Sequence, residues 1–300
     1  MFARYRMAAV AGAGLACLWL AGGLHGDLLA WRTRNDPPEI GVLDQAPPLL
    51  TLATVALGGF RGIVADILWL RLSHLQDAGR YVEMVQLSDW ISKMQPHTAE
   101  IWEFHAWNMA YNVSVIMAEP EDRWRWVWHG VRLLRDEGLI YNPREPRLYQ
   151  QLAWMFFHKI GKTADTAHEH YKERLAEKTV AALGGTHADY DLLLRSPERA
   201  QRLRGTLRMD PRFMRETESE FGPLDWTRPE SHAVYWANLG RARNPDKDVS
   251  WCERMIVQAL RAMAEQDAAR PYDPDSATDP DPAPPPPTVP PASAPAILTR

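Results

Sequence analysis

The amino-acid sequence predicts an all-α protein whose main helical domain covers residues 49–270. Three observations predict this fold class. Apolar side chains recur three and four residues apart along several segments, which places them on one face of a helix. No stretch alternates apolar and polar residues for long enough to suggest a sheet. One pattern of helix-forming residues also returns 47 residues after its first occurrence, which indicates a repeat.

The N-terminal segment has the composition of a membrane anchor. Residues 7–24 carry no charge and follow Arg4 and Arg6. Eighteen apolar residues can span a bilayer, and a basic flank stays in the cytoplasm. We therefore expect residues 1–30 to form a basic cytoplasmic flank and an uncleaved signal-anchor helix. The protein would cross the inner (cytoplasmic) membrane once, with its helical domain on the outer, periplasmic side. A cleaved signal peptide is the alternative.

Two further segments are predicted to lie outside the helical domain. Residues 31–48 are expected to link the anchor to it. Residues 271–300 are rich in proline and nearly devoid of apolar side chains. Such a segment cannot bury enough apolar surface to offset its ordering entropy, so we expect a disordered tail.

Composition excludes some classes of partner and site. The formal net charge of -4 gives no basic patch, so we expect no nucleic acid partner. The two cysteines, Cys17 and Cys252, cannot form a zinc site by themselves. Thirteen tryptophans are unusual for a chain of this length, and many of them fall between Trp90 and Trp154.

Residues 49–70 form a second apolar run, which raises the question of a second membrane span. Arg61 and Asp66 lie inside it. Each charge costs about 2.5 to 3.5 kcal/mol at the centre of a bilayer. We therefore predict that residues 60–78 form the first helix of the domain and do not cross the membrane.

The first repeat unit is defined by a glycine, an aromatic residue and a proline. Gly79 and Tyr81 open a helical segment that ends before Pro96. The next helix carries its predicted core stripe at positions i, i+3, i+4 and i+7, namely Trp102, His105, Ala106 and Met109. The small Ala106 would allow a neighbouring helix to approach closely.

The same order of residues follows Pro143. The equivalent stripe consists of Tyr149, Leu152, Ala153 and Phe156. Residues 163–178 are predicted to be the helix that pairs with this segment. A third, fainter unit is placed at Pro211, with one more helix pair in residues 231–266.

These features resemble a known family. The Gly79-x-Tyr81 start and the proline that ends the helix are similar to the second helix of a tetratricopeptide repeat. The resemblance covers residues 62–183 and extends to residues 206–266. It implies an α-solenoid of tetratricopeptide-like helix pairs. Residues 60–71 also resemble a segment in an uncharacterised group of membrane-anchored bacterial proteins, which implies an envelope protein but supplies no reaction.

The opposite face of the two equivalent helices holds the candidate site. It carries Glu103, Trp107 and Tyr111 in one unit and Gln150, Trp154 and His158 in the next. In tetratricopeptide-like arrays this face lines the concave groove, and stacking places equivalent positions side by side. The six residues are therefore predicted to form a groove for a protein or peptide partner. The alternative is that Trp107 and Trp154 belong to the core, where tryptophans of helical domains commonly lie.

No catalytic, metal-binding or cofactor motif occurs in the sequence. His168 and His170 lie two apart on a predicted helix, so they point to different faces, and no metal is expected. His105 is interpreted as a buried histidine whose hydrogen bonds are satisfied. We predict a non-enzymatic scaffold without cofactors. The alternative is an envelope hydrolase or transferase with histidine and glutamate residues in the groove.

Overall fold

A computed structural model describes residues 61–163, 165–185 and 187–269. The predicted flank and anchor (1–30), the linker (31–48) and the tail (271–300) lie outside the described residues. Within these three ranges every regular element is a helix, which confirms the all-α fold class. The helices are α3 (Arg61–Asp77), α4 (Tyr81–Met94), α5 (Ala99–Trp107), η2 (Asn108–Val113), α6 (Ser114–Ile116), α7 (Pro120–Leu133), η3 (Leu134–Gly138), α8 (Leu139–Tyr141), α9 (Pro146–Trp154), η4 (Met155–Ile160), α10 (His168–Leu183), α11 (Tyr190–Arg195), α12 (Pro197–Leu207), α13 (Pro211–Phe221), α14 (Pro229–Arg243) and α15 (Ser250–Ala268).

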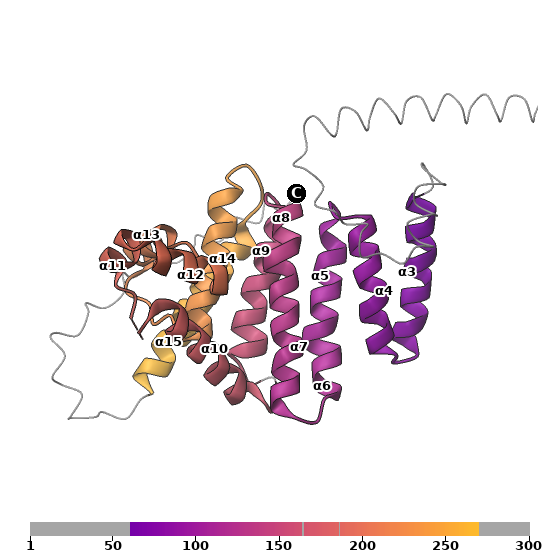
Figure 1. Ribbon diagram of the computed structural model, residues 1–300, viewed down its shortest axis with the longest axis horizontal. Coiled ribbons are helices and arrows are strands. Elements are labelled where there is room, and N and C mark those ends of the chain that lie inside the picture. Colours follow the sequence, from indigo (N-terminus) through magenta and orange to yellow (C-terminus); the bar gives the residue numbers. More distant parts are fainter. Residues whose placement is uncertain (1–60, 164, 186, 270–300) are drawn as a thin grey trace, which may run out of the picture.

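The longer helices stand side by side in chain order. Figure 1 shows α3, α4, α5, α7 and α9 in one row, with α14 and α15 beyond α9. Between η4 and α14 the chain passes through α10 and the short helices α11, α12 and α13, which gather near the α14 end of the row. Neighbouring helices therefore supply most of the packing contacts.

The first described helix agrees with the sequence prediction. Helix α3 covers Arg61–Asp77, against an expected range of 60–78. Gly79 has φ +66°, a left-handed conformation that glycine adopts without strain, and it turns the chain into α4 at Tyr81. In the part of the chain that the structure describes, no helix is both long enough and apolar enough to cross a membrane.

One helix–turn–helix corner occurs three times with the same backbone geometry. Gln95, Asn142 and Asn244 have φ between -129° and -131° and ψ between 56° and 62°. Each carbonyl accepts a hydrogen bond from the N–H three residues later, at 3.1 to 3.2 Å. A proline follows each of them. The third corner is thus at Pro245, and its prediction at Pro211 was wrong, because Pro211 instead begins α13 behind the N-cap Asp210.

Three of the long helices change from α-helical to π-helical geometry part of the way along. The six-residue π-helical segments η2 and η4 begin 47 residues apart, at the same place in the two repeat units. The third, η3, continues α7. In these segments the backbone hydrogen bonds run from i to i+5 instead of i to i+4.

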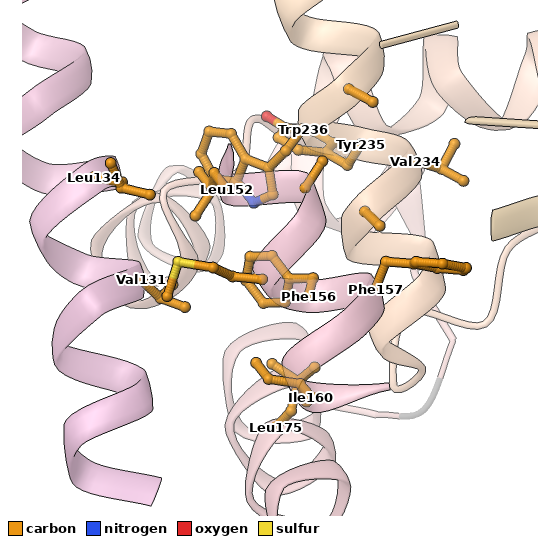
Figure 2. Packing of buried hydrophobic residues seen from close by; sticks show 14 of the residues in the cluster. Val131, Leu134, Leu152, Phe156, Phe157, Ile160, Leu175, Val234, Tyr235 and Trp236 are labelled. Atoms are coloured by element: carbon orange, nitrogen blue, oxygen red, sulfur yellow. The ribbon is translucent and has the colours of Figure 1, made fainter. Parts of the chain in front are cut away.

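The core confirms both predicted stripes. Trp102, His105, Ala106 and Met109 are at most 5% exposed, and Tyr149, Leu152, Ala153 and Phe156 are at most 1% exposed. Figure 2 shows Phe156 and Ile160 of η4 at the centre of this cluster, between Val131 of α7 and Val234 of α14. A smaller cluster joins α3, α4 and α5 through Leu72, Leu75, Met84, Leu87, Ile91 and Ile101.

The structure corrects the prediction of which helix pairs with α9 and η4, the first helix of the second repeat unit. Residues 163–178 were expected to pair with it, and α10 does touch η4 at one end. However, α14 is the helix that lies along α9 and η4. Arg243 of α14 donates a hydrogen bond from Nη1 to Tyr149 Oη at 2.9 Å. The chain therefore inserts α10–α13 between two helices that pack together, which the spacing of the sequence pattern did not reveal.

A buried ionic network closes the turn after η4. Lys159 Nζ lies 2.6 Å from Asp165 Oδ2, and both side chains are at most 3% exposed. Tyr171 Oη donates to Asp165 Oδ2 at 3.0 Å, and Arg123 Nη1 lies 3.2 Å from Oδ1. Burial opposes ionisation of Asp165, but the hydrogen bonds from Lys159 and from the Ala167 N–H outweigh it and lower the pKa of Asp165 to about 2.

We predict that Ala106→Leu or Ala153→Leu will overpack the core and cost about 1 to 3 kcal/mol of unfolding free energy. The helices are already in close contact at Ala106, because a Cβ placed on Gly130 of α7 would lie 2.7 Å from the Ala106 carbonyl oxygen. Thermal melts measure the effect, with Ala264→Leu on the exposed face of α15 as the control. Melting temperatures unchanged in both core variants would contradict this packing.

Asp165→Asn is expected to cost about 3 to 5 kcal/mol, because it leaves the Lys159 charge buried without its partner. The pKa of Asp165 is lower in the folded state than its ordinary value of 3.8. Its contribution to stability is therefore complete above about pH 4 and is lost as the pH falls toward 2. Acid unfolding followed by circular dichroism should be less steep in this variant than in the wild type.

The matched control is Asp122→Asn, which removes an exposed carboxylate 3.0 Å from Arg125. An exposed pair contributes about 1 kcal/mol or less. Equal losses of stability in the two variants would show that the Asp165 network does not hold the turn.

Candidate functional site

The structure brings four of the six predicted site residues into one run of ring contacts. The Trp107 and Tyr111 rings stack with centroids 5.5 Å apart, and Tyr111 stacks on His158 at 5.9 Å. His158 in turn stacks on Trp154 at 4.6 Å with an interplanar angle of 9°. We call Trp107, Tyr111, His158 and Trp154 the aromatic ladder. It crosses from α5 and η2 to α9 and η4.

Helical spacing explains how each half of the ladder is built. Trp107 immediately precedes η2, and Trp154 immediately precedes η4. Each tryptophan stacks on the residue four positions later, Tyr111 or His158, because residues four apart are neighbours on the surface of a helix. The two halves meet where Tyr111 Oη lies 3.3 Å from His158 Nδ1.

The ladder is accessible to solvent along its length. Trp107 is 38% exposed, whereas Trp102 on the opposite face is 1% exposed. Tyr111, Trp154 and His158 are partly exposed. For Trp107 the alternative that it belongs to the core is therefore wrong, and Trp154 lies at the boundary between core and surface.

The side chains of the ladder carry no charge at pH 7, although the cation Lys159 lies beside them. Lys159 Nζ lies 5.3 Å from the centre of the Tyr111 ring, within the range of a cation–π contact. Burial lowers the pKa of His158, and the nearby charge of Lys159 lowers it further, so the imidazole is neutral at pH 7. Burial raises the pKa of the Tyr111 hydroxyl. The ladder thus presents uncharged rings.

Glu103 lies at the Trp107 end, in a pocket rather than in the stack. Burial raises the pKa of its carboxyl, and Arg147, with Nε at 2.7 Å, partly offsets the rise. The pocket has a volume of about 410 Å³ and is lined by Trp69, Glu100, Glu103, Phe104, Trp107 and Arg147. Gln150 is partly exposed on α9, and no hydrogen bond joins its side chain to another described residue.

Two residues of this surface were missed by the sequence reasoning. Arg147 lies three residues before Gln150, so helical spacing already placed it on the same face. Trp251 of α15 continues the ladder, with its ring centroid 6.2 Å from that of Trp154. Trp251 follows Pro245 by six residues, as the core residues Trp102 and Tyr149 follow their prolines, so the repeat spacing gave no signal that would place it beside the ladder.

The other histidines make different contacts from those expected. His105 is buried as predicted, but neither ring nitrogen has a hydrogen-bond partner among the described residues, so the expectation that it is satisfied was wrong. His170 Nε2 lies 3.1 Å from Glu121 Oε2. Within the described ranges, no three histidine, cysteine, aspartate or glutamate side chains converge as metal ligands would.

Comparison with known proteins gives no relative from which a role could be transferred. No protein-family model, no curated protein and no solved structure matches this chain.

Proposed function

We propose that this protein is a non-enzymatic, membrane-anchored helical-repeat scaffold that binds a protein or peptide partner in the bacterial cell envelope. The observation that carries the proposal is the aromatic ladder. Its four rings come from equivalent positions of two neighbouring helices and remain accessible to solvent.

A ladder of this kind suits an extended peptide. Aromatic side chains offer a large contact area and lose little conformational entropy on binding. Successive ring centroids are 4.6 to 5.9 Å apart. The two stacked pairs lie side by side, so at about 3.3 Å per residue an extended segment of about two residues would cross from one pair to the other.

The pocket beside Trp107 would add specificity at one end of the peptide. Trp69 and Phe104, whose rings are in contact at 5.5 Å, form an apolar wall. Arg147 faces them between Glu100 and Glu103, at 3.1 and 2.7 Å. One apolar side chain of the partner would enter this pocket. Polar groups next to that side chain in the partner would bind Arg147, Glu100 and Glu103.

The repeat architecture supports the scaffold proposal. The recurrence of one corner geometry three times, and of a π-helical segment at the same place in two units, is the kind of repetition expected of an α-solenoid built from stacked helix pairs. The inserted helices α10–α13 would then be an elaboration on one face of the array. The uncharged run at residues 7–24 favours attachment to the inner membrane with the array on the periplasmic side.

The alternative, an envelope hydrolase or transferase, requires an acid and a base within hydrogen-bond reach of one reacting group. In the ladder His158 contacts Tyr111, whose hydroxyl is a weaker acid than usual. The Glu103 carboxylate is bound by Arg147 at the far end. These two observations favour binding over acid–base catalysis at this surface.

Trp107→Ala is expected to weaken partner binding by about 2 kcal/mol or more and to leave the melting temperature nearly unchanged, because the side chain is exposed. Trp154→Ala should weaken binding and also lower stability, since its ring is partly buried. Trp102→Ala, on the core face, should cost about 3 to 5 kcal/mol of stability. The partner is recovered by affinity purification of full-length protein from its native membrane, and thermal melts are run in parallel.

The control for this experiment is Ile140→Ala, which removes a 50% exposed apolar side chain on α8 outside the ladder. The scaffold proposal fails if Trp107→Ala and Ile140→Ala recover the same partners in equal amounts. A large drop in the melting temperature of Trp107→Ala would instead assign that ring to packing.

The membrane topology has its own test. Protease added to intact spheroplasts should digest the helical domain of the full-length protein, because the basic flank with Arg4 and Arg6 holds the N-terminus in the cytoplasm. Cytoplasmic marker proteins serve as the internal control. Full protection of the domain until the membrane is lysed would reverse the proposed orientation.

A further inference from the structure

A second pocket lies on another side of α5, between α4, α5 and α7. It has a volume of about 350 Å³, which is in the range of small-molecule sites. Its apolar floor includes Met109 and Leu133, both less than 10% exposed. Trp126 of α7 forms part of the wall. None of these residues belongs to the aromatic ladder.

His105 is the polar group at the floor of this pocket. It is 2% exposed, and neither of its ring nitrogens has a hydrogen-bond partner among the described residues. Burial lowers its pKa to about 4, although Asp89 opposes the change, so the ring is neutral at pH 7. A neutral imidazole carries one N–H donor and one nitrogen acceptor. A buried polar group without a partner is unfavourable, and a ligand in the pocket would remove that penalty.

Carboxylates dominate the remaining polar lining. The side chain of Glu137, an exposed residue, makes no ion pair or hydrogen bond within the described ranges, and partial burial together with the nearby Asp89 charge raises the pKa of its carboxyl. Asp89 is paired with Lys93 at 2.8 Å. Asp136 is neutralised by arginines, the nearest being Arg135 at 2.7 Å. The charged residues that line the pocket are thus three carboxylates and one arginine, and Glu137 is the carboxylate to which no cation is directly bonded.

Arg132 and His129 complete the charged and titratable lining. Arg132 is exposed, and its nearest carboxylate is Asp136 at 3.6 Å, which Arg135 and Arg208 also bond. His129 is exposed at the rim, and burial of part of its ring lowers its pKa, which leaves it neutral at pH 7. A metal ion is a poor fit, because within the described residues no three side chains of the ligating types converge.

We propose that this pocket binds a small organic cation, a primary amine or a guanidine with a short apolar body. Its N–H groups would donate to Glu137, to Asp89 and to a ring nitrogen of His105. Its apolar body would pack on Met109 and Leu133. The Trp126 ring would lie beside the cation, where a π face attracts positive charge. This site goes beyond the scaffold function, since it is separate from the ladder and would take a different class of ligand.

The test is calorimetric titration of the full-length protein in detergent with simple probes of one shape and different charge. Phenethylamine and benzamidine should bind saturably. Phenethyl alcohol, the neutral counterpart, should bind at least about tenfold more weakly, and phenylacetate should not bind. Equal binding of the alcohol and the amine, or no saturable binding of either cation, would overturn the proposal.

Two variants locate the site. Glu137→Gln should weaken phenethylamine binding by about tenfold or more. Glu173→Gln, which removes an exposed charge from α10, should leave binding unchanged. His105→Phe keeps an aromatic ring but removes both nitrogens, so binding should be lost while the melting temperature stays equal or rises. Retained affinity in Glu137→Gln, or a clear fall in the melting temperature of His105→Phe, would assign these groups to the fold and contradict the proposed site.

Discussion

The anchoring of an aromatic side chain to each of the first two helix corners sets the register on which the other features depend. Trp102 Nε1 donates to the Pro96 carbonyl at 2.8 Å, and Tyr149 Oη donates to the Pro143 carbonyl at 2.9 Å. Both aromatic residues follow their proline by six positions, so each helix starts at the same point relative to its corner. Equivalent positions of α5 and α9 then lie side by side, so the residues at these positions in the two helices are neighbours on the surface.

Stacking along each helix turns that register into a continuous surface. Residues four apart are neighbours on the surface of a helix, so Trp107 stacks on Tyr111 and Trp154 on His158, just as Trp124 stacks on Trp128 within α7. On the opposite face Ala106, Ala110 and Ser114, at the same spacing, are all 0% exposed and belong to the core.

Much of the fold could be predicted from the sequence, because the spacing of apolar residues and the glycines and prolines at turns are local signals. The stripe that includes Trp102 and the turn at Gly79 could be predicted from spacing alone. The grouping of Trp107 and Tyr111 with Trp154 and His158 followed from the 47-residue shift, whereas Glu103 and Gln150, predicted with them, lie outside the stack. The insertion of α10–α13 could not be predicted, since its helices carry the same amphipathic pattern as their neighbours. Neither could the π-helical segments or the unpaired nitrogens of His105, which depend on contacts between distant residues.

The central claim is that the ladder forms one surface that a partner covers as a unit. Fluorine NMR of full-length protein labelled with fluorotryptophan tests it most directly, with each signal assigned by a single Trp→Phe substitution. When solubilised native envelope proteins are added, the signals of Trp107 and Trp154 should shift or broaden together, and that of Trp102 on the core face, 1% exposed, should not change. Unchanged ladder signals, or equal changes at all three tryptophans, would contradict the account.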